Sequence, residues 1–280
     1  MSFSFKVTIS LGLCLLVMYF SPSLLLASSD DTQQNSGSAC EDKWNSLFSG
    51  SSRRGVSELI KIWLNEKNLC LNSGFYEFKL GWLYIYSEEY TKALNTFKRG
   101  IEKNKGYVKD LKLGIADVSF NRASRAGQKS EYAIAESLYR EMIQEYPTWH
   151  APYEQMAALK LLQDEFESSV EYGENSVRIQ PTAYAYRNLA ISYQNIGQYE
   201  KCIEAMNDGY ELDKTLFEDK NLMLSTSVSY TKLKKFELAR NTLAVLMQNR
   251  EGIENDPDFN MVLNYLKNQL QINGIESLPN

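Results

Sequence analysis

The sequence predicts an all-α protein in which antiparallel helix pairs stack in a line as a solenoid. One observation is a triplet of apolar or small residues at i, i+3 and i+7, which places three side chains on one helical face. The other is its recurrence, since the first members of six triplets lie 34, 42, 34, 33 and 37 residues apart. A helix pair of that length cannot bury its apolar face alone, so this period indicates stacking. The triplets are Val56-Leu59-Trp63, Tyr90-Ala93-Phe97, Tyr132-Ala135-Tyr139, Phe166-Ser169-Gly173, Tyr199-Cys202-Met206 and Phe236-Ala239-Leu243.

The start of the chain has a different character. Residues 1–29 are expected to form a secretory signal peptide, because Lys6 precedes an apolar run from Val7 to Phe20 and small residues follow. Cleavage after Ala27 or at the end of this range would make the protein periplasmic or secreted. The alternative is an uncleaved segment that anchors the chain in a membrane. Residues 30–39 are small and polar, which predicts a flexible leader.

A second pattern precedes most triplets and sets a small residue of the first helix opposite a small residue of the second, so that the two backbones approach closely. Leu80, Gly81 and Tyr84, followed by Ala93 and Phe97, give the clearest copy. At these residues the chain resembles the tetratricopeptide-repeat (TPR) family, whose signature is Leu-Gly-x-x-Tyr followed by Ala-x-x-x-Phe. The resemblance implies a right-handed superhelix.

Five TPR-like repeats are expected over residues 74–253, preceded by a degenerate first repeat over residues 40–73. The second full repeat is longer than the others, and its excess over residues 121–130 predicts a lengthened turn. Gly173 stands where a large aromatic residue is usual, which predicts looser packing in the third full repeat.

The last segment, residues 254–280, is expected to hold a capping helix and a tail. Asp256 is a suitable N-cap and Pro257 a suitable first helical residue. The helix should run to about residue 271 with one apolar face, which would cover the exposed end of the solenoid.

Net charge argues against a nucleic-acid partner, because 35 Asp and Glu outnumber 30 Lys and Arg. Charge is nevertheless uneven: residues 98–129 hold nine basic and three acidic residues, and residues 154–174 hold six acidic and one basic. Solvated helix faces explain this distribution. The alternative is a bipolar surface that orients a partner or pairs copies of the chain in a homo-oligomer.

Export would permit disulfide formation. Cys40 is expected at the start of the first helix of the degenerate repeat and Cys70 at the end of its second. An antiparallel helix pair brings those two ends side by side, so a disulfide is predicted. The alternative is two separate buried thiols. Cys202 occupies a small-residue position between helices and is expected to be buried.

No residue pattern points to catalysis. The single histidine, His150, has no second histidine or nearby cysteine at a metal-binding spacing, and no nucleophile is placed beside a base. We therefore predict no enzyme activity, no metal site and no cofactor.

In the TPR family the first helix of each repeat lines a concave groove that holds a peptide or protein segment, and the resemblance implies the same here. Aromatic residues and arginine are common interface anchors. The alternative for the aromatic residues is core packing against the preceding repeat, and the alternative for the polar ones is ordinary solvation. The groove positions are Phe75, Phe78, Trp82 and Tyr86 in the repeat that begins at residue 74, and Tyr184, Arg187, Gln194 and Asn195 in the repeat that begins at residue 183.

The sequence thus predicts a non-catalytic protein–protein interaction module or assembly scaffold of the cell envelope. Two alternatives remain open: a self-assembling structural subunit, and an accessory or regulatory subunit of an envelope enzyme. The family's carboxylate clamp for chaperone tails needs Lys and Asn on successive first helices, and the matching positions here hold other residues.

Overall fold

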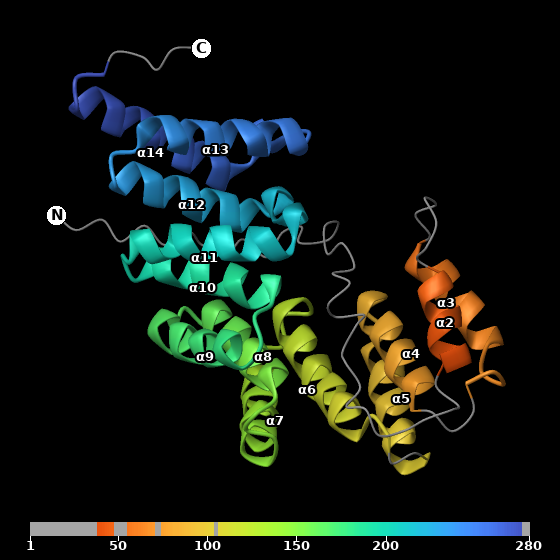
Figure 1. The fold of residues 1–280 in the computed structure, drawn as a ribbon. Helices are drawn as coiled ribbons and strands as arrows, with labels where there is room; N and C mark the ends of the chain where they lie inside the picture. Colours follow the sequence, from red (N-terminus) through yellow and green to blue (C-terminus); the bar gives the residue numbers. More distant parts are fainter. Residues whose placement is uncertain (1–37, 48–54, 71–73, 104–105, 276–280) are drawn as a thin grey trace. The chain divides into compact units, whose positions relative to one another are not determined.

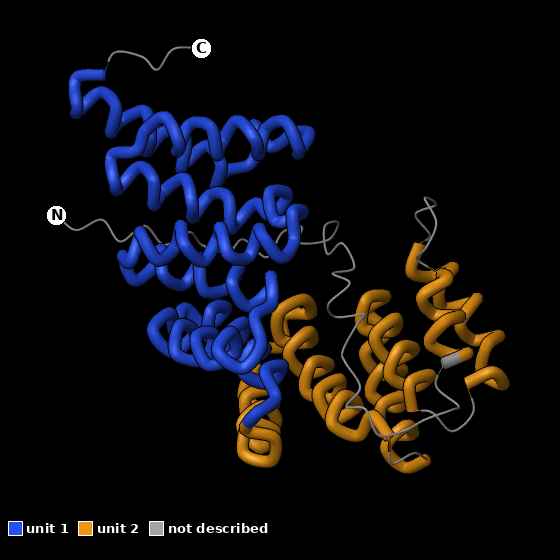
Figure 2. Tube along the Cα trace, viewed as in Figure 1, with its two compact units in different colours: residues 1–25, 148–280 blue, residues 26–147 orange. Residues whose placement is uncertain are grey.

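The computed structural model describes residues 38–47, 55–70, 74–103 and 106–275, and the regular elements among them are all helices (Figure 1). These are thirteen α-helices, α2 to α14, and two short 3-10 helices. The chain divides into two compact units, whose described residues lie before and after residue 147 (Figure 2). The predicted signal peptide and the predicted leader up to residue 37 lie outside the described residues.

The N-terminal unit consists of three helix pairs. In each pair we call the first helix the A-helix and the second the B-helix. The A-helix of the second pair contacts that of the third, the second and third B-helices pack against their own A-helices, and the first B-helix contacts the A-helix of the second pair. The helices are α2 (Ser38–Ser46) with α3 (Val56–Asn65), α4 (Phe75–Tyr86) with α5 (Tyr90–Lys103), and α6 (Val108–Ser124) with α7 (Glu131–Glu145).

Phe97 on α5 is the central packing residue of this unit and is fully buried. It lies between two A-helices at positions where both have glycine. A Cβ atom added to Gly81 of α4 would come within 2.3 Å of the Phe97 ring, and one added to Gly114 of α6 within 2.5 Å. The ring therefore occupies the space that two missing side chains leave, and it links consecutive pairs.

The C-terminal unit continues with three more pairs and a final helix. The A-helix α10 packs against both neighbouring A-helices, α8 and α12, while the B-helix α11 packs against α10 and α12. The A-helices therefore form a continuous layer. The elements are α8 (His150–Leu162), α9 (Phe166–Ile179), α10 (Ala183–Asn195), α11 (Tyr199–Leu212), η1 (Lys214–Glu218), α12 (Lys220–Lys232), α13 (Phe236–Asn249), η2 (Ile253–Asn255) and α14 (Pro257–Ile272).

The recurring triplets lie on the buried faces of α3, α5, α7, α9, α11 and α13. In all six, the second and third members are buried, from Leu59 and Trp63 in α3 to Ala239 and Leu243 in α13. Free Cys202 is likewise buried. These residues confirm the all-α repeat solenoid that the spacing predicted.

The turn between the two helices of a pair has the same backbone conformation in four pairs. One residue of each turn has a positive φ: 61° at Glu88, 61° at Asp164, 79° at Gly197 and 58° at Lys234. Glycine adopts this left-handed conformation without penalty, whereas the three other residues carry steric strain. The repeat geometry thus imposes a conformation that the local sequence favours in only one of the four turns.

The final helix begins and ends as predicted. Asp256 accepts hydrogen bonds from the backbone N–H groups of Asp258 and Phe259, at 3.0 and 3.1 Å, and Pro257 is the first helical residue. Phe259 and Val262 are buried against α12 and α13. This is the contact expected of a helix that caps a repeat stack.

One local expectation was confirmed in part and one was wrong. The turn between α6 and α7 is lengthened but shorter than predicted, because α6 continues to Ser124 and the turn occupies residues 125–130. Packing at Gly173 is tight, since an added Cβ would lie 2.8 Å from Leu189 on α10. The glycine lets a leucine of the next pair approach instead of leaving space.

Candidate binding surface

Phe75 and Phe78, predicted to line a groove, lie in the core. Their side chains are 6% and 4% exposed. Both rings pack against Tyr107, whose ring centroid lies 5.8 Å from that of Phe75 and 6.2 Å from that of Phe78. The Phe75 ring also packs edge-on against Trp63, with 6.2 Å between the two centroids. The core-packing interpretation of these two residues therefore holds, and the groove assignment is corrected.

Trp82 and Tyr86 of the same helix are the aromatic pair that stays half-exposed. They are one helical turn apart, and their ring centroids lie 5.9 Å from each other at an interplanar angle of 35°. Each ring thus presents part of its surface to solvent. Large, rigid aromatic side chains in such positions are favourable contacts for a partner.

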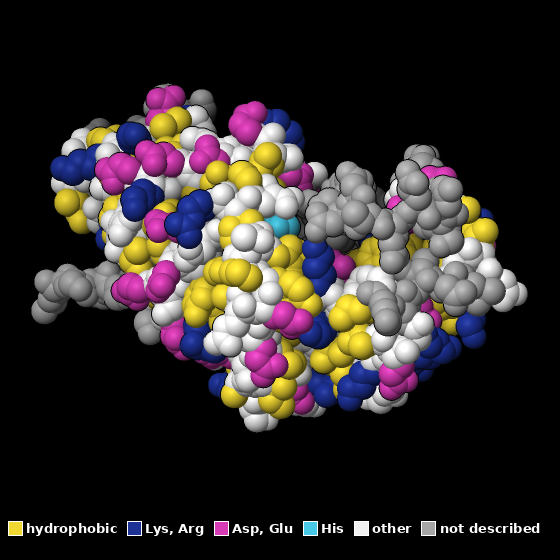
Figure 3. All heavy atoms as spheres, turned by 60° about the horizontal axis from the view of Figure 1, so that its bottom comes forward, with side chains coloured by type: hydrophobic (Ala, Val, Ile, Leu, Met, Phe, Trp, Pro, Cys, Tyr) yellow, Lys and Arg dark blue, Asp and Glu magenta, His cyan; other side chains and the backbone are white. Residues whose placement is uncertain are grey.

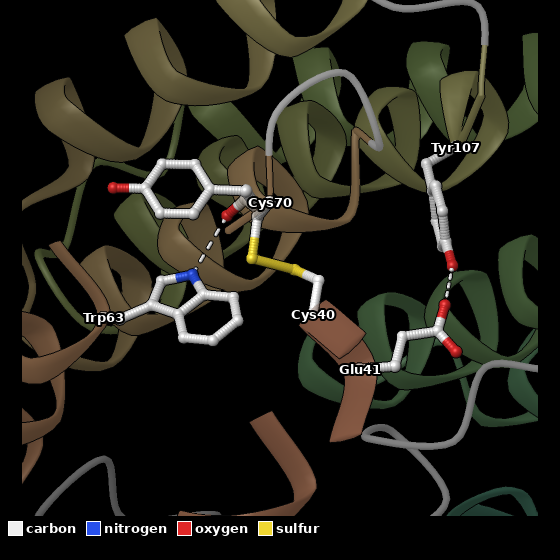
Figure 4. The surroundings of a disulfide bond; sticks show 6 residues. Cys40, Glu41, Trp63, Cys70 and Tyr107 are labelled. Atoms are coloured by element: carbon white, nitrogen blue, oxygen red, sulfur yellow. Dashed lines mark hydrogen bonds between the residues drawn. A yellow bond between two sulfur atoms is a disulfide. The ribbon is translucent and has the colours of Figure 1, made fainter. Parts of the chain in front are cut away.

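Three bonds hold the N-terminal pair together and join it to the segments that follow (Figure 4). Cys40 at the start of α2 forms the predicted disulfide with Cys70, with the two Cα atoms 5.1 Å apart. The Tyr107 hydroxyl donates a hydrogen bond of 2.6 Å to Glu41 of α2, and the Trp63 indole donates one of 3.2 Å to the carbonyl of Tyr76. The degenerate repeat is therefore an integral part of the unit.

Lys79 is a buried cation that the sequence did not reveal. Its ammonium nitrogen lies 5.4, 5.1 and 4.9 Å from the ring centroids of Trp44, Phe75 and Phe78. Burial lowers its pKa to about 8, and the nearby Asp110 and Glu41 carboxylates oppose this shift. Cation–π contacts with three rings offset part of the desolvation penalty.

Arg187, predicted as a groove anchor, forms a structural ion pair. Its Nε lies 2.6 Å from Oδ2 of Asp219, and its Nη1 donates to Oδ1 of Asn188 at 3.0 Å. Asp219 is the N-cap of α12, where its Oδ1 accepts from the backbone N–H of Leu222. Arg187 therefore joins α10 to the beginning of α12.

The other three predicted positions of α10 differ in exposure. Gln194 is buried at 3% exposure, which corrects its assignment to an open surface. Asn195 is half-buried, and its side-chain amide donates a hydrogen bond of 2.9 Å to the carbonyl of Ile191 in its own helix. Tyr184 is half-buried near the start of the helix. Of the predicted α10 set, Tyr184 and Asn195 remain as candidate contacts.

Similar links join the beginnings of all consecutive A-helices in the C-terminal unit, a feature that sequence reasoning missed. The Thr182 hydroxyl, which caps α10 by accepting from Ala185 N at 3.0 Å, donates to the carboxylate of Glu154 on α8. Lys220 at the start of α12 lies 2.9 Å from Oδ2 of both Asp256 and Asp258 at the start of α14. Together with Arg187–Asp219, these links hold each N-cap to the preceding A-helix.

Glu154 is the most strongly desolvated carboxyl of this series. Burial raises its pKa to about 7, and the hydrogen bond from Thr182 opposes the shift. Thr182 is the one hydrogen-bond partner that the described residues provide to this carboxyl group. At neutral pH the group therefore lies near its titration midpoint.

Several residues of the charged segments form ion pairs within their own units. In the N-terminal unit Lys112 lies 2.7 Å from Glu145, Arg99 lies 3.9 Å from Glu77, and Arg122 lies 3.5 Å from Glu131. Figure 3 shows Lys and Arg side chains interspersed with Asp and Glu over the face in view. This distribution fits solvated helix faces better than a bipolar surface.

The described residues bring together no group of three or more His, Cys, Asp and Glu side chains that could hold a metal ion. No helix among them is both long enough and apolar enough to cross a bilayer.

No protein-family model matches the sequence, and no curated protein matches it. Solved structures do match. Yeast Tom70 is 11% identical with a TM-score of 0.59, over 82% of this chain and 46% of that one. The APC/C hetero-tetramer Cut9–Hcn1 is 13% identical with a TM-score of 0.48, over 75% of this chain and 46% of that one. This chain thus spans less than half of either. YrrB, described as a TPR protein with an unusual peptide-binding site, is 13% identical with a TM-score of 0.46, over 73% of this chain and 97% of that one.

The helix pairs, their buried triplets and the continuous layer of A-helices define an all-α helical repeat solenoid. Within that class, the chain has the tetratricopeptide-repeat fold.

Proposed function

We propose that this chain is a non-catalytic protein-interaction module that binds a peptide or protein segment on the exposed face of its A-helices. The observation that carries the proposal is the half-exposed pair Trp82 and Tyr86 on α4, a helix whose other large aromatic residues, apart from Tyr84, are buried. Half-exposed aromatic side chains on a rigid helix lose little conformational entropy when a partner covers them.

The links between A-helices support the same proposal for the C-terminal unit. Arg187–Asp219 and Lys220–Asp256 fix the beginnings of α10, α12 and α14 relative to one another. A surface that is already ordered needs little rearrangement when it binds. Tyr184 and Asn195, half-buried on α10, are the positions of this layer through which we expect contact.

We further propose that the protein acts outside the cytoplasm, in the periplasm or after secretion. The Cys40–Cys70 disulfide supports this location, because disulfides persist mainly in oxidising compartments. The basic and then apolar start of the sequence is consistent with export. Sequencing the N-terminus of the protein recovered from its host tests the proposal. A mature chain that begins between residues 28 and 30 would support it, and a cytoplasmic chain that retains Met1 or Ser2 would refute it.

The binding proposal is tested by affinity capture from an envelope extract with the wild-type chain and the W82A/Y86A variant. We expect the variant to lose the specifically captured partner by at least tenfold. The matched control is Y132A, which removes a half-buried tyrosine from the B-helix α7. If the W82A/Y86A variant and the control capture the same partner equally well, the surface that we propose is wrong.

A further inference from the structure

Four lysines and two exposed aliphatic residues gather at one end of the last helix pair. The helix α12 ends at Lys232, and α13 begins three residues after the turn residue Leu233. The end of α14 lies nearby, because α14 runs parallel to α12: Lys220 contacts Asp256 at the two beginnings, and Lys232 Nζ lies 5.3 Å from the Tyr265 ring further along. We call this surface the basic end; it consists of Lys232, Lys234, Lys235, Leu238, Lys267 and Ile272.

Among the described residues, no carboxylate forms an ion pair with the lysines of the basic end. Of these lysines, Lys234, Lys235 and Lys267 are exposed. In the described segments 232–240 and 263–275, the single carboxylate is Glu237. Other basic residues of the C-terminal unit do have an acidic partner. They are Lys160, Arg187, Lys201, Lys214 and Lys220.

The corresponding turns of the two preceding pairs in the C-terminal unit have a different charge. Asp164-Glu165 occupies the turn between α8 and α9, and Gly197-Gln198 the turn between α10 and α11. The turn between α12 and α13 has Lys234-Lys235 at the same places. Among the three turns of this unit, the positive charge is therefore a property of the last one.

Two aliphatic side chains accompany the lysines. Leu238, in the first turn of α13, is 45% exposed, and Ile272, the last residue of α14, is 74% exposed. Both belong to helix ends at the same end of the unit. Lysines and exposed aliphatic side chains at one end of a unit have the chemistry of a surface that meets phospholipid headgroups and the outer part of the acyl layer.

We propose that the basic end binds the surface of an anionic phospholipid membrane. The lysines would contact headgroup phosphates while Leu238 and Ile272 enter the headgroup–acyl boundary. An acidic protein segment is the weaker interpretation, because it would satisfy the lysines but leave the two aliphatic side chains in water. This inference does not depend on the proposed binding of a peptide by the A-helices.

The test is co-sedimentation of the full chain with vesicles of phosphatidylcholine alone or with 30% phosphatidylglycerol, at low and high salt. We expect at least tenfold stronger binding to the anionic vesicles at low salt and loss of this difference at high salt, because salt screens surface charge. The variant K234E/K235E/K267E should lose the difference. The milder K234A/K235A variant should retain an intermediate part of it, and circular dichroism checks that both variants fold.

The control variant K67E/K98E/K103E changes net charge equally, at exposed lysines of the N-terminal unit. It should bind anionic vesicles within twofold of wild type. The L238S/I272S variant should bind several-fold more weakly at constant salt. The proposal is overturned if wild type binds both kinds of vesicle equally, or if the triple variant binds like wild type. Binding of a polyglutamate peptide through these lysines without binding to anionic vesicles would equally overturn it.

Discussion

Replacing Glu154 by Gln should make the protein more stable at alkaline pH and leave its stability nearly unchanged at acidic pH. The carboxyl group is buried on α8, and burial raises its pKa from an ordinary value of 4.5 to about 7. Between these two values the folded chain holds a proton that the unfolded chain has released. Stability from this group is therefore present below pH 4.5 and is lost as the pH rises to 7.

The size of the effect follows from the difference between the two pKa values. Each unit corresponds to about 1.4 kcal/mol, so ionisation of the buried carboxyl lowers the free energy of unfolding by about 3 kcal/mol above pH 7. A glutamine side chain is neutral at every pH and can still accept the hydrogen bond from Thr182. The stability difference between E154Q and wild type should then grow from about 0.8 kcal/mol at pH 5 to about 3 kcal/mol at pH 8.

Urea unfolding followed by circular dichroism, at one-unit steps from pH 5 to pH 8, measures this difference. Subtracting the wild-type free energy of unfolding at the same pH removes the contribution of the other carboxyl groups, which both proteins share. The control variant is E167Q, at an exposed position of α9, which should show no such trend. A difference between E154Q and wild type that stays constant over this pH range would refute the reasoning.

Three further predictions concern stability and can be measured by the same urea unfolding. The C40S/C70S variant should lose about 3.5 kcal/mol in free energy of unfolding, because the disulfide closes a loop across a sequence separation of 30 in the unfolded chain. A loss below about 1 kcal/mol would contradict this stabilising role of the disulfide. Gly81→Ala should lose about 2–3 kcal/mol, since the added methyl group overlaps the Phe97 ring, and an unchanged midpoint would show that this packing is wrong. Lys234→Gly should gain roughly 0.5–1 kcal/mol by relieving the left-handed strain. Its control, K235G, alters a neighbour with an ordinary φ of −89° and should be destabilising; a destabilised K234G would count against the turn geometry.

The fold could be predicted from the sequence because its signals are local and repeated. The triplets that include Ala93 and Phe97 need only helical spacing to identify a buried face, and the N-cap at Asp256 needs only two adjacent residues. The Cys40–Cys70 disulfide followed from the antiparallel arrangement of one helix pair. In each case the interacting residues belong to one helix or to neighbouring helices of known direction.

The candidate site was harder to predict because exposure depends on contacts between repeats. Phe75 and Trp82 lie on the same helix at groove-like spacing, yet Phe75 is covered by Trp44 of α2 and by Tyr107, which precedes α6. Arg187 is engaged by Asp219, which lies 32 residues further along the chain. A single sequence does not reveal which polar residues pair at such distances.

The left-handed turns and the buried Lys79 were missed for the same physical reason. Lysine usually lies in solvent, and a non-glycine residue seldom adopts a positive φ, so both features contradict local preference. They occur because packing of the neighbouring helices outweighs a local cost of about 1–2 kcal/mol.

The central claim is that successive helix pairs of the C-terminal unit stabilise one another mainly through contacts between neighbours. Amide hydrogen exchange, resolved for each helix by mass spectrometry, tests it most directly when the full chain is compared with a chain that ends at residue 255 and lacks α14. We predict that protection falls most in α12 and α13, less in α10 and α11, and least in α8 and α9. An equal loss of protection in all six helices, or no loss in α12 and α13, would contradict the account.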